Sequence, residues 1–140
     1  MLLVIPVLAL AAVAPNPDVM KIDVRDAHVI ATPAGGSAVV SMLLSNPTSS
    51  TLDMVGASTP LAGETTLQHY IKDSEGLVQI APLTDLRIPA HGEALLASGG
   101  TELQLINLTQ ELKSGLELPL TLKFADGTHR VVRIEVKGDE

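Results

Sequence analysis

Residues 116–136 read LELPLTLKFADGTHRVVRIEV, and this stretch decides the fold class. Two candidate strands, Leu116–Phe124 and Arg130–Val136, flank the sequence Ala125-Asp126-Gly127-Thr128. An Asp-Gly pair tolerates the positive φ angles of a tight turn between antiparallel strands. The stretch therefore predicts a β-hairpin.

The chain before this hairpin shows the same organisation of short β segments separated by Pro- and Gly-containing turns. The segments are Ile22–Ile30, Ser37–Ser45, Leu52–Ala57, Thr65–Ile71, Leu77–Pro82, Ala94–Leu96 and Leu103–Asn107. Thr109–Ser114 is expected to form a single helical turn that stops at Gly115. Eight or nine short strands at this spacing predict an all-β antiparallel sandwich or barrel.

The composition excludes several classes of function and limits what can form the core. The 140 residues carry a net charge of −7, and their nine Lys and Arg residues are scattered, which argues against nucleic-acid binding. Tyr70 and Phe124 are the only aromatic residues, so the core must be built from Leu, Val, Ile and Ala. Cysteine is absent, which excludes disulfides, thiolate chemistry and a lipidated N-terminal Cys.

The first residues have the pattern of a targeting signal. Leu2–Val13 is an apolar run that would span about 18 Å as a helix, too short for a hydrocarbon core of about 30 Å. Ala12-Val13-Ala14 has the small-x-small pattern of a signal-peptidase site. Residues 1–14 are therefore predicted to be a signal peptide, with a buried N-terminal strand as the alternative. Residues 20–137 are predicted to form one β-sandwich domain.

The order of these segments resembles the periplasmic copper chaperones of the PCu(A)C family. The matching sequences are Val24-Arg25-Asp26-Ala27, Ala31-Thr32-Pro33, Met42-Leu43-Leu44-Ser45-Asn46, Leu67-Gln68-His69, Ile88-Pro89-Ala90-His91-Gly92, Ser98-Gly99-Gly100, Gly115 and Leu120-Thr121-Leu122-Lys123-Phe124. The resemblance implies a cupredoxin-like, immunoglobulin-like sandwich in the periplasm or elsewhere in the cell envelope. It also implies Cu(I) as cargo and an oxidase assembly protein as partner.

The copper motif of that family is His, ten residues, Met, twenty-one residues, then His-x-Met. Counted from His69, the pattern falls without a gap on Ile80, Glu102 and Gln104. Cu(I) favours thioether sulfur and imidazole, whereas Glu102 and Gln104 offer hard oxygen and Ile80 offers no ligand. The resemblance thus places a metal site at His69, Glu102 and Gln104 with changed chemistry. Cu(I) binding there is expected to be weak, altered or lost, and a convergent site would suit Cu(II) or Zn(II) better.

The other histidines have ordinary structural interpretations. His91 lies in a turn and is expected to be solvated, His129 is expected to be an exposed strand residue, and His28 occupies a position that is usually Trp in the family. No G-x-S-x-G nucleophile elbow or phosphate-binding glycine loop occurs, so no enzymatic activity is expected. Two functions remain: a copper-handling protein with an altered site, and a metal-free interaction module of the cell envelope.

Overall fold

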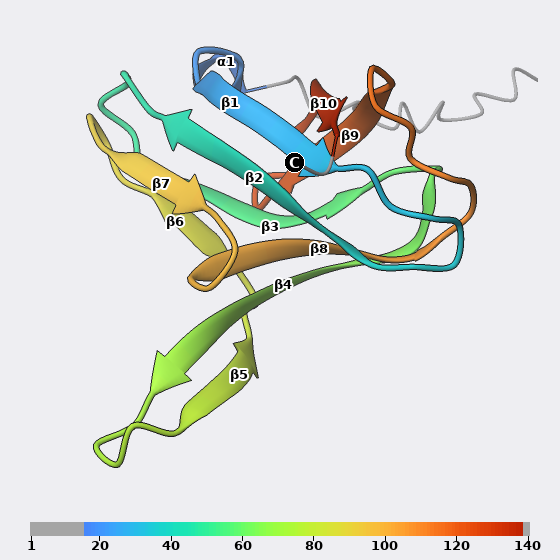
Figure 1. The fold of residues 1–140 in the computed structure, drawn as a ribbon. Helices are drawn as coiled ribbons and strands as arrows, with labels where there is room; N and C mark the ends of the chain where they lie inside the picture. Colours follow the sequence, from blue (N-terminus) through green and yellow to red (C-terminus); the bar gives the residue numbers. More distant parts are fainter. Residues whose placement is uncertain (1–15, 139–140) are drawn as a thin grey trace, which may run out of the picture.

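The computed structural model describes residues 16–138, and these form a structure that is nearly all β (Figure 1). The elements are α1 (Pro17–Met20), β1 (Asp23–Ile30), β2 (Ala38–Ser45), β3 (Leu52–Ser58), β4 (Ala62–Lys72), β5 (Val78–Pro82), β6 (Leu86–Ile88), β7 (Glu93–Leu96), β8 (Thr101–Leu108), β9 (Glu117–Phe124) and β10 (His129–Lys137). The all-β prediction is confirmed, with ten strands instead of eight or nine. The additional strand is β6.

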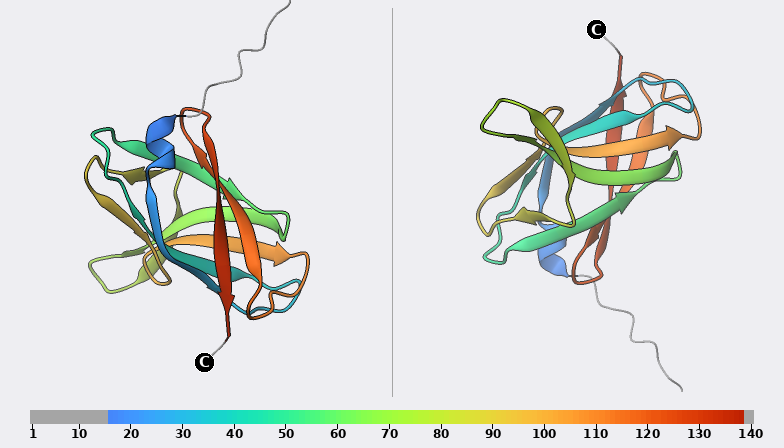
Figure 2. Two further views of the ribbon diagram at one scale, coloured as in Figure 1. Left: turned by 90° about the horizontal axis from the view of Figure 1, so that it is seen from above. Right: turned by 90° about the horizontal axis from the view of Figure 1, so that it is seen from below.

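The strands form one hydrogen-bonded path in the order β5-β4-β8-β2-β1-β10-β9-β3-β6, and β7 also pairs with β2. Among residues 16–138, only β1 and β10 pair in parallel. The path folds over on itself so that β3 lies beside β4 and β6 lies beside β7. Figure 2 shows the resulting layers from two sides.

The predicted hairpin is present as β9 and β10. The Phe124 N–H donates to the Thr128 carbonyl over 2.9 Å, and the Gly127 N–H donates to the Phe124 carbonyl over 3.0 Å. Gly127 has a φ of +88°, the left-handed conformation that a glycine adopts without strain. Full pairing from His129–Lys123 to Glu135–Glu117 follows from this turn.

The core is aliphatic, as the composition requires. Leu118, Leu120 and Leu122 on β9, Met54 on the neighbouring strand β3 and Leu105 on β8 are all almost completely buried. Each such side chain stabilises the fold by about 1.5–3 kcal/mol relative to an exposed position. Phe124 is the single aromatic residue in this core.

The prediction of a helical turn at Thr109–Ser114 is wrong. Leu112 instead forms a β-bridge with Thr32, through N–H to carbonyl bonds of 2.8 and 3.2 Å. This bridge allows the Leu112 side chain to be buried, which a local helical turn would not provide. Gly115, with a φ of +92°, still marks the point where the chain turns into β9.

At the N-terminal end, the carbonyl oxygens of Val19 and Ile22 accept hydrogen bonds from Arg130 on β10, which fastens the short α1 segment to the sheet. No helix within residues 16–138 combines the length and apolar character needed to cross a bilayer. The predicted signal peptide, residues 1–14, lies outside the described residues.

Candidate functional site

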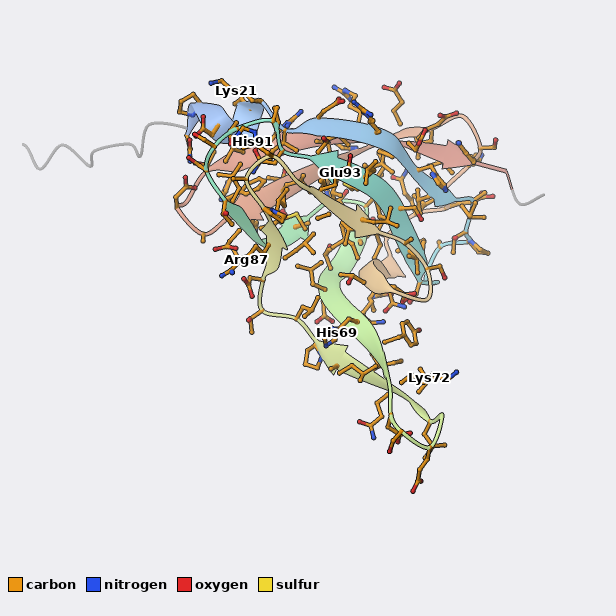
Figure 3. The ribbon with its side chains drawn as sticks, turned by 90° about the vertical axis from the view of Figure 1, so that its left-hand side faces the viewer. Lys21, His69, Lys72, Arg87, His91 and Glu93 are labelled. Atoms are coloured by element: carbon orange, nitrogen blue, oxygen red, sulfur yellow. The ribbon has the colours of Figure 1, made fainter. Side chains whose placement is uncertain are left out.

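The four positions of the copper motif lie on three adjacent strands, β4, β5 and β8. His69 on β4 is paired with Ala81 on β5 and with Thr101 on β8. Ile80 is paired with Tyr70, one residue further along β4. On the β8 side, Glu102 pairs with Gln68 and Gln104 pairs with Thr66. Figure 3 shows His69 where β4 leaves the body of the sandwich.

The strand pairing separates His69 from the other three positions. Paired residues in an antiparallel ladder point to the same face of the sheet, and consecutive residues point to opposite faces. His69 therefore shares a face with Ala81 and Thr101. The Gln68–Glu102, Tyr70–Ile80 and Thr66–Gln104 pairs all lie on the other face. The structure thus brings Ile80, Glu102 and Gln104 to one face and directs His69 to the opposite one.

Glu102 is buried, with 2% of its surface exposed, and both of its carboxylate oxygens have donors within the protein. The Gln68 side-chain amide donates to Oε1 over 3.3 Å, and the Gly99 backbone N–H donates to Oε2 over 3.1 Å. These contacts hold the Ala97–Gly100 loop between β7 and β8. The sequence could not reveal this role because Gln68 and Gly99 lie 34 and 3 residues away, on different elements.

The chemical capacity of these positions follows from the side chains present. Ile80 is 56% exposed and has no donor atom, and Gln104 is half-buried and offers an amide. Across residues 16–138, no group of three or more His, Asp or Glu side chains is placed to hold a metal ion. The residues do not match the preference of Cu(I) for sulfur and imidazole. Metal binding by His69, Glu102 and Gln104 stays a prediction.

The remaining histidines lie elsewhere on the sandwich. The His28 Nδ1 lies 2.8 Å from the Asp26 carbonyl oxygen, at a bulge in β1 where Asp26 has a φ of +52°. A shallow cavity of about 310 Å³ beside His28 is lined mostly by apolar residues, including Leu43 and Leu95. His91 lies in a turn, as expected (Figure 3), and its backbone N–H donates to the Thr48 carbonyl. His129 is exposed at the start of β10, also as expected.

Comparisons with known proteins agree with this architecture. Residues 22–136 match the model of the family described as "Putative lipoprotein LpqE-like". The protein "Putative lipoprotein Lxx21020" of Leifsonia xyli subsp. xyli is 28% identical over 127 residues, which cover 91% of this chain and 76% of that protein.

Two solved structures show the same fold. The solution structure of apo-DR1885 from Deinococcus radiodurans is 32% identical, with a TM-score of 0.65 over 84% of this chain and 79% of that one. The copper-bound PCuAC domain from PmoF2 is 16% identical, with a TM-score of 0.68 over 85% of this chain and 94% of that one. The chain therefore belongs to the LpqE-like family, and it has the β-sandwich fold of the PCuAC domains.

Proposed function

We propose that this protein is an exported member of the copper-chaperone superfamily that has lost the Cu(I) site and works as a metal-free binding module. The observation that carries this proposal is the buried Glu102 carboxylate. Both of its oxygens accept hydrogen bonds from the protein, so a metal ion would have to share these buried oxygens with Gln68 and Gly99. The position that a soft metal would need is occupied by a structural acceptor.

The rest of the proposal follows from the family. Residues 1–14 would be removed as a signal peptide, which leaves residues 20–137 as the working domain in the periplasm or another part of the cell envelope. The copper-bound PCuAC domain from PmoF2 and the Cu(I) form of DR1885 support a binding role, not a catalytic one. An oxidase assembly protein is the partner that the copper-chaperone resemblance suggests.

The competing function is copper handling through an altered site, in which His69 is the surviving ligand. It predicts that copper raises the melting temperature of the protein and that His69→Ala removes this effect. The metal-free module predicts the same melting temperature with and without copper in both proteins. Differential scanning calorimetry with Cu(I) under anaerobic conditions, and separately with Cu(II), distinguishes the two functions.

The direct test is an anaerobic Cu(I) titration against a competing chelator. The wild type is compared with the triple variant Ile80→Met, Glu102→His, Gln104→Met, which returns three ligands to one face of the sheet. We expect the triple variant to bind Cu(I) at least about 100-fold more tightly, equivalent to about 2.8 kcal/mol. The melting temperature of the copper-free triple variant controls for loss of the Glu102 hydrogen bonds. Equal Cu(I) affinity in a folded variant and the wild type would show the proposal to be wrong.

A further inference from the structure

The end of β4 and the whole of β5 form a β-hairpin that projects from the sandwich, and we name residues 68–82 the arm. Figure 1 shows the arm at the lower left, and Figure 3 shows it extending below the body with Lys72 near its tip. Among residues 16–138, β5 is the first strand of the sheet order and pairs with β4 on one side only. The other side of β5 is therefore a sheet edge.

The backbone groups that face this edge can be assigned from the ladder. The Leu83 N–H donates to the Leu67 carbonyl, and at the other end the Asp73 N–H donates to the Leu77 carbonyl. Antiparallel pairs alternate between hydrogen-bonded and non-hydrogen-bonded, so residues 77, 79, 81 and 83 direct their backbone groups toward β4. Val78 and Ile80 therefore direct both N–H and C=O outward, and Pro82 directs its C=O outward.

The side chains of the arm are apolar where solvent reaches them. Val78 and Ile80 are 59% and 56% exposed, and they share a face with the half-buried Tyr70. Leu77 and Ile71 are also exposed. Natural proteins usually protect an edge strand with charged side chains, bulges or a covering segment, because an unprotected edge pairs with another strand. Within the part of the chain that the structure describes, the Val78–Ile80 part of the edge has none of these protections. Its one protective feature is the flanking Pro82.

The charges around the arm indicate what kind of strand fits. Asp73 and Glu75 lie at the tip and Asp85 follows the other end of β5, against the single cation Lys72. A second copy pairing antiparallel through β5 would bring the acidic tip of each copy to the Asp85 end of the other. Like charges at close range oppose such pairing, and the net charge of −7 adds to the repulsion. A segment with basic residues at both ends is complementary instead.

From these observations we infer that β5 is a docking edge for an extended segment of another protein, which adds to the sheet as an antiparallel strand. The segment has apolar residues opposite Val78 and Ile80 and Lys or Arg at its ends. Main-chain hydrogen bonds hold such a strand, and its alternate side chains select it. The inference deepens the proposed function by assigning the site and the partner class of the binding module.

The first test uses synthetic peptides. We expect Lys-Val-Thr-Ile-Thr-Val-Lys to bind the wild-type protein saturably, and Glu-Val-Thr-Ile-Thr-Val-Glu to bind at least about tenfold more weakly because of the acidic ends of β5. Isothermal titration calorimetry at low ionic strength measures both affinities. Equal affinities, or no binding of the basic peptide up to about 1 mM, would overturn the inference.

Backbone pairing is tested with N-methylated peptides. Val78 and Ile80 direct their backbone groups outward, so a peptide residue opposite either of them exchanges N–H and C=O hydrogen bonds with it. The apolar Val and Ile residues of the peptide are the ones expected opposite Val78 and Ile80. Their N–H groups are therefore the ones that pair with β5. N-methylation of those residues is expected to abolish binding, and N-methylation of the two Thr residues is expected to preserve it. Binding that depends on side chains alone would respond equally to both modifications, and this result would contradict strand addition.

The protein side is tested with a matched pair of variants. Ile80→Lys and Leu95→Lys each place a charge at an apolar residue that is 56% or 60% exposed, but Leu95 lies on β7, away from the arm. We expect Ile80→Lys to weaken binding of the basic peptide by at least about tenfold and Leu95→Lys to leave it unchanged. Bound peptide should also slow amide hydrogen exchange at Val78 and Ile80, whose N–H groups face outward. Exchange protection confined to other strands would place the peptide elsewhere.

The two proposals fail separately. Tight Cu(I) binding by the wild type would contradict the metal-free function and leave the edge-strand result unaffected. A failed peptide experiment would remove the docking edge and leave the copper titration unaffected.

Discussion

At the scale of single residues, Glu102 shows how a ligand position becomes a structural one. A buried acceptor that keeps two donors satisfied contributes to stability, and its removal leaves those donors unpaired. Glu102 joins Gln68 on β4 to Gly99 in the β7–β8 loop. Its neighbour Gln104 lies on the same face but is only half-buried.

Replacement of Glu102 is therefore expected to destabilise the fold. Glu102→Ala should lower the free energy of unfolding by about 1–3 kcal/mol, because the Gly99 N–H and the Gln68 amide lose their acceptor in a buried place. Glu102→Gln should have a smaller effect, since one side-chain oxygen remains. Urea denaturation followed by circular dichroism measures both, with Gln104→Ala as the control. A Glu102→Ala protein as stable as the control would contradict the structural role.

At the scale of elements, the β9–β10 hairpin is organised by Asp126. The Thr128 backbone N–H donates to Asp126 Oδ1 over 2.9 Å, and the Asn16 side-chain amide donates to Oδ2 over 3.0 Å. Hydrogen bonds from the Thr128 N–H and then from the Thr128 hydroxyl lower the pKa of Asp126 below its ordinary value. Desolvation opposes this shift, and the hydrogen bond from Asn16 adds to it. The charged form of Asp126 therefore supports the turn.

This shift predicts the pH dependence of the hairpin. A carboxyl with a lowered pKa adds stability above its unfolded pKa of about 3.9 and loses that contribution as the pH falls through the folded value. We expect the wild type to be more stable than Asp126→Asn at pH 7, with a difference that disappears as the pH falls below about 3.9. Urea midpoints at a series of pH values measure this difference. A difference that stays constant down to the lowest pH would show that charge is not involved.

At the scale of the whole molecule, the arm and the sandwich differ in what holds them. The sandwich encloses a continuous aliphatic core, whereas most of the arm beyond Leu67 is half-buried or exposed. Regions with few buried apolar contacts open at lower free energy than the core. The sole tyrosine, Tyr70, lies on the arm and the chain has no tryptophan, so intrinsic tyrosine fluorescence reports the arm alone.

Unfolding should consequently be seen in two steps. Tyr70 fluorescence is expected to change at a lower urea concentration than the far-ultraviolet circular dichroism, which reports the whole sheet. The basic peptide that docks on β5 should move the fluorescence transition to a higher urea concentration, toward the circular-dichroism transition. Coincident transitions in the free protein would mean that the arm and the sandwich unfold as one cooperative unit.

The amino-acid sequence by itself determined nine of the ten strands, the β9–β10 turn and the aliphatic nature of the core. These features depend on local properties, namely the tolerance of Asp126-Gly127 for a tight turn and the placing of apolar residues along each strand. The motif counted from His69 to Gln104 also selects positions that lie on three neighbouring strands, β4, β5 and β8.

Only the tertiary structure decided what those residues do. A shift of one residue in register exchanges the two faces of a strand, so the side on which His69 lies was set by long-range pairing. The same holds for Asn46, which directly follows β2. In the fold it is buried, and its amide donates to the Ser50 and Ile88 carbonyls. Burial of Glu102 and the edge position of β5 likewise depend on which strands become neighbours, and contacts between distant segments are not encoded in any local pattern.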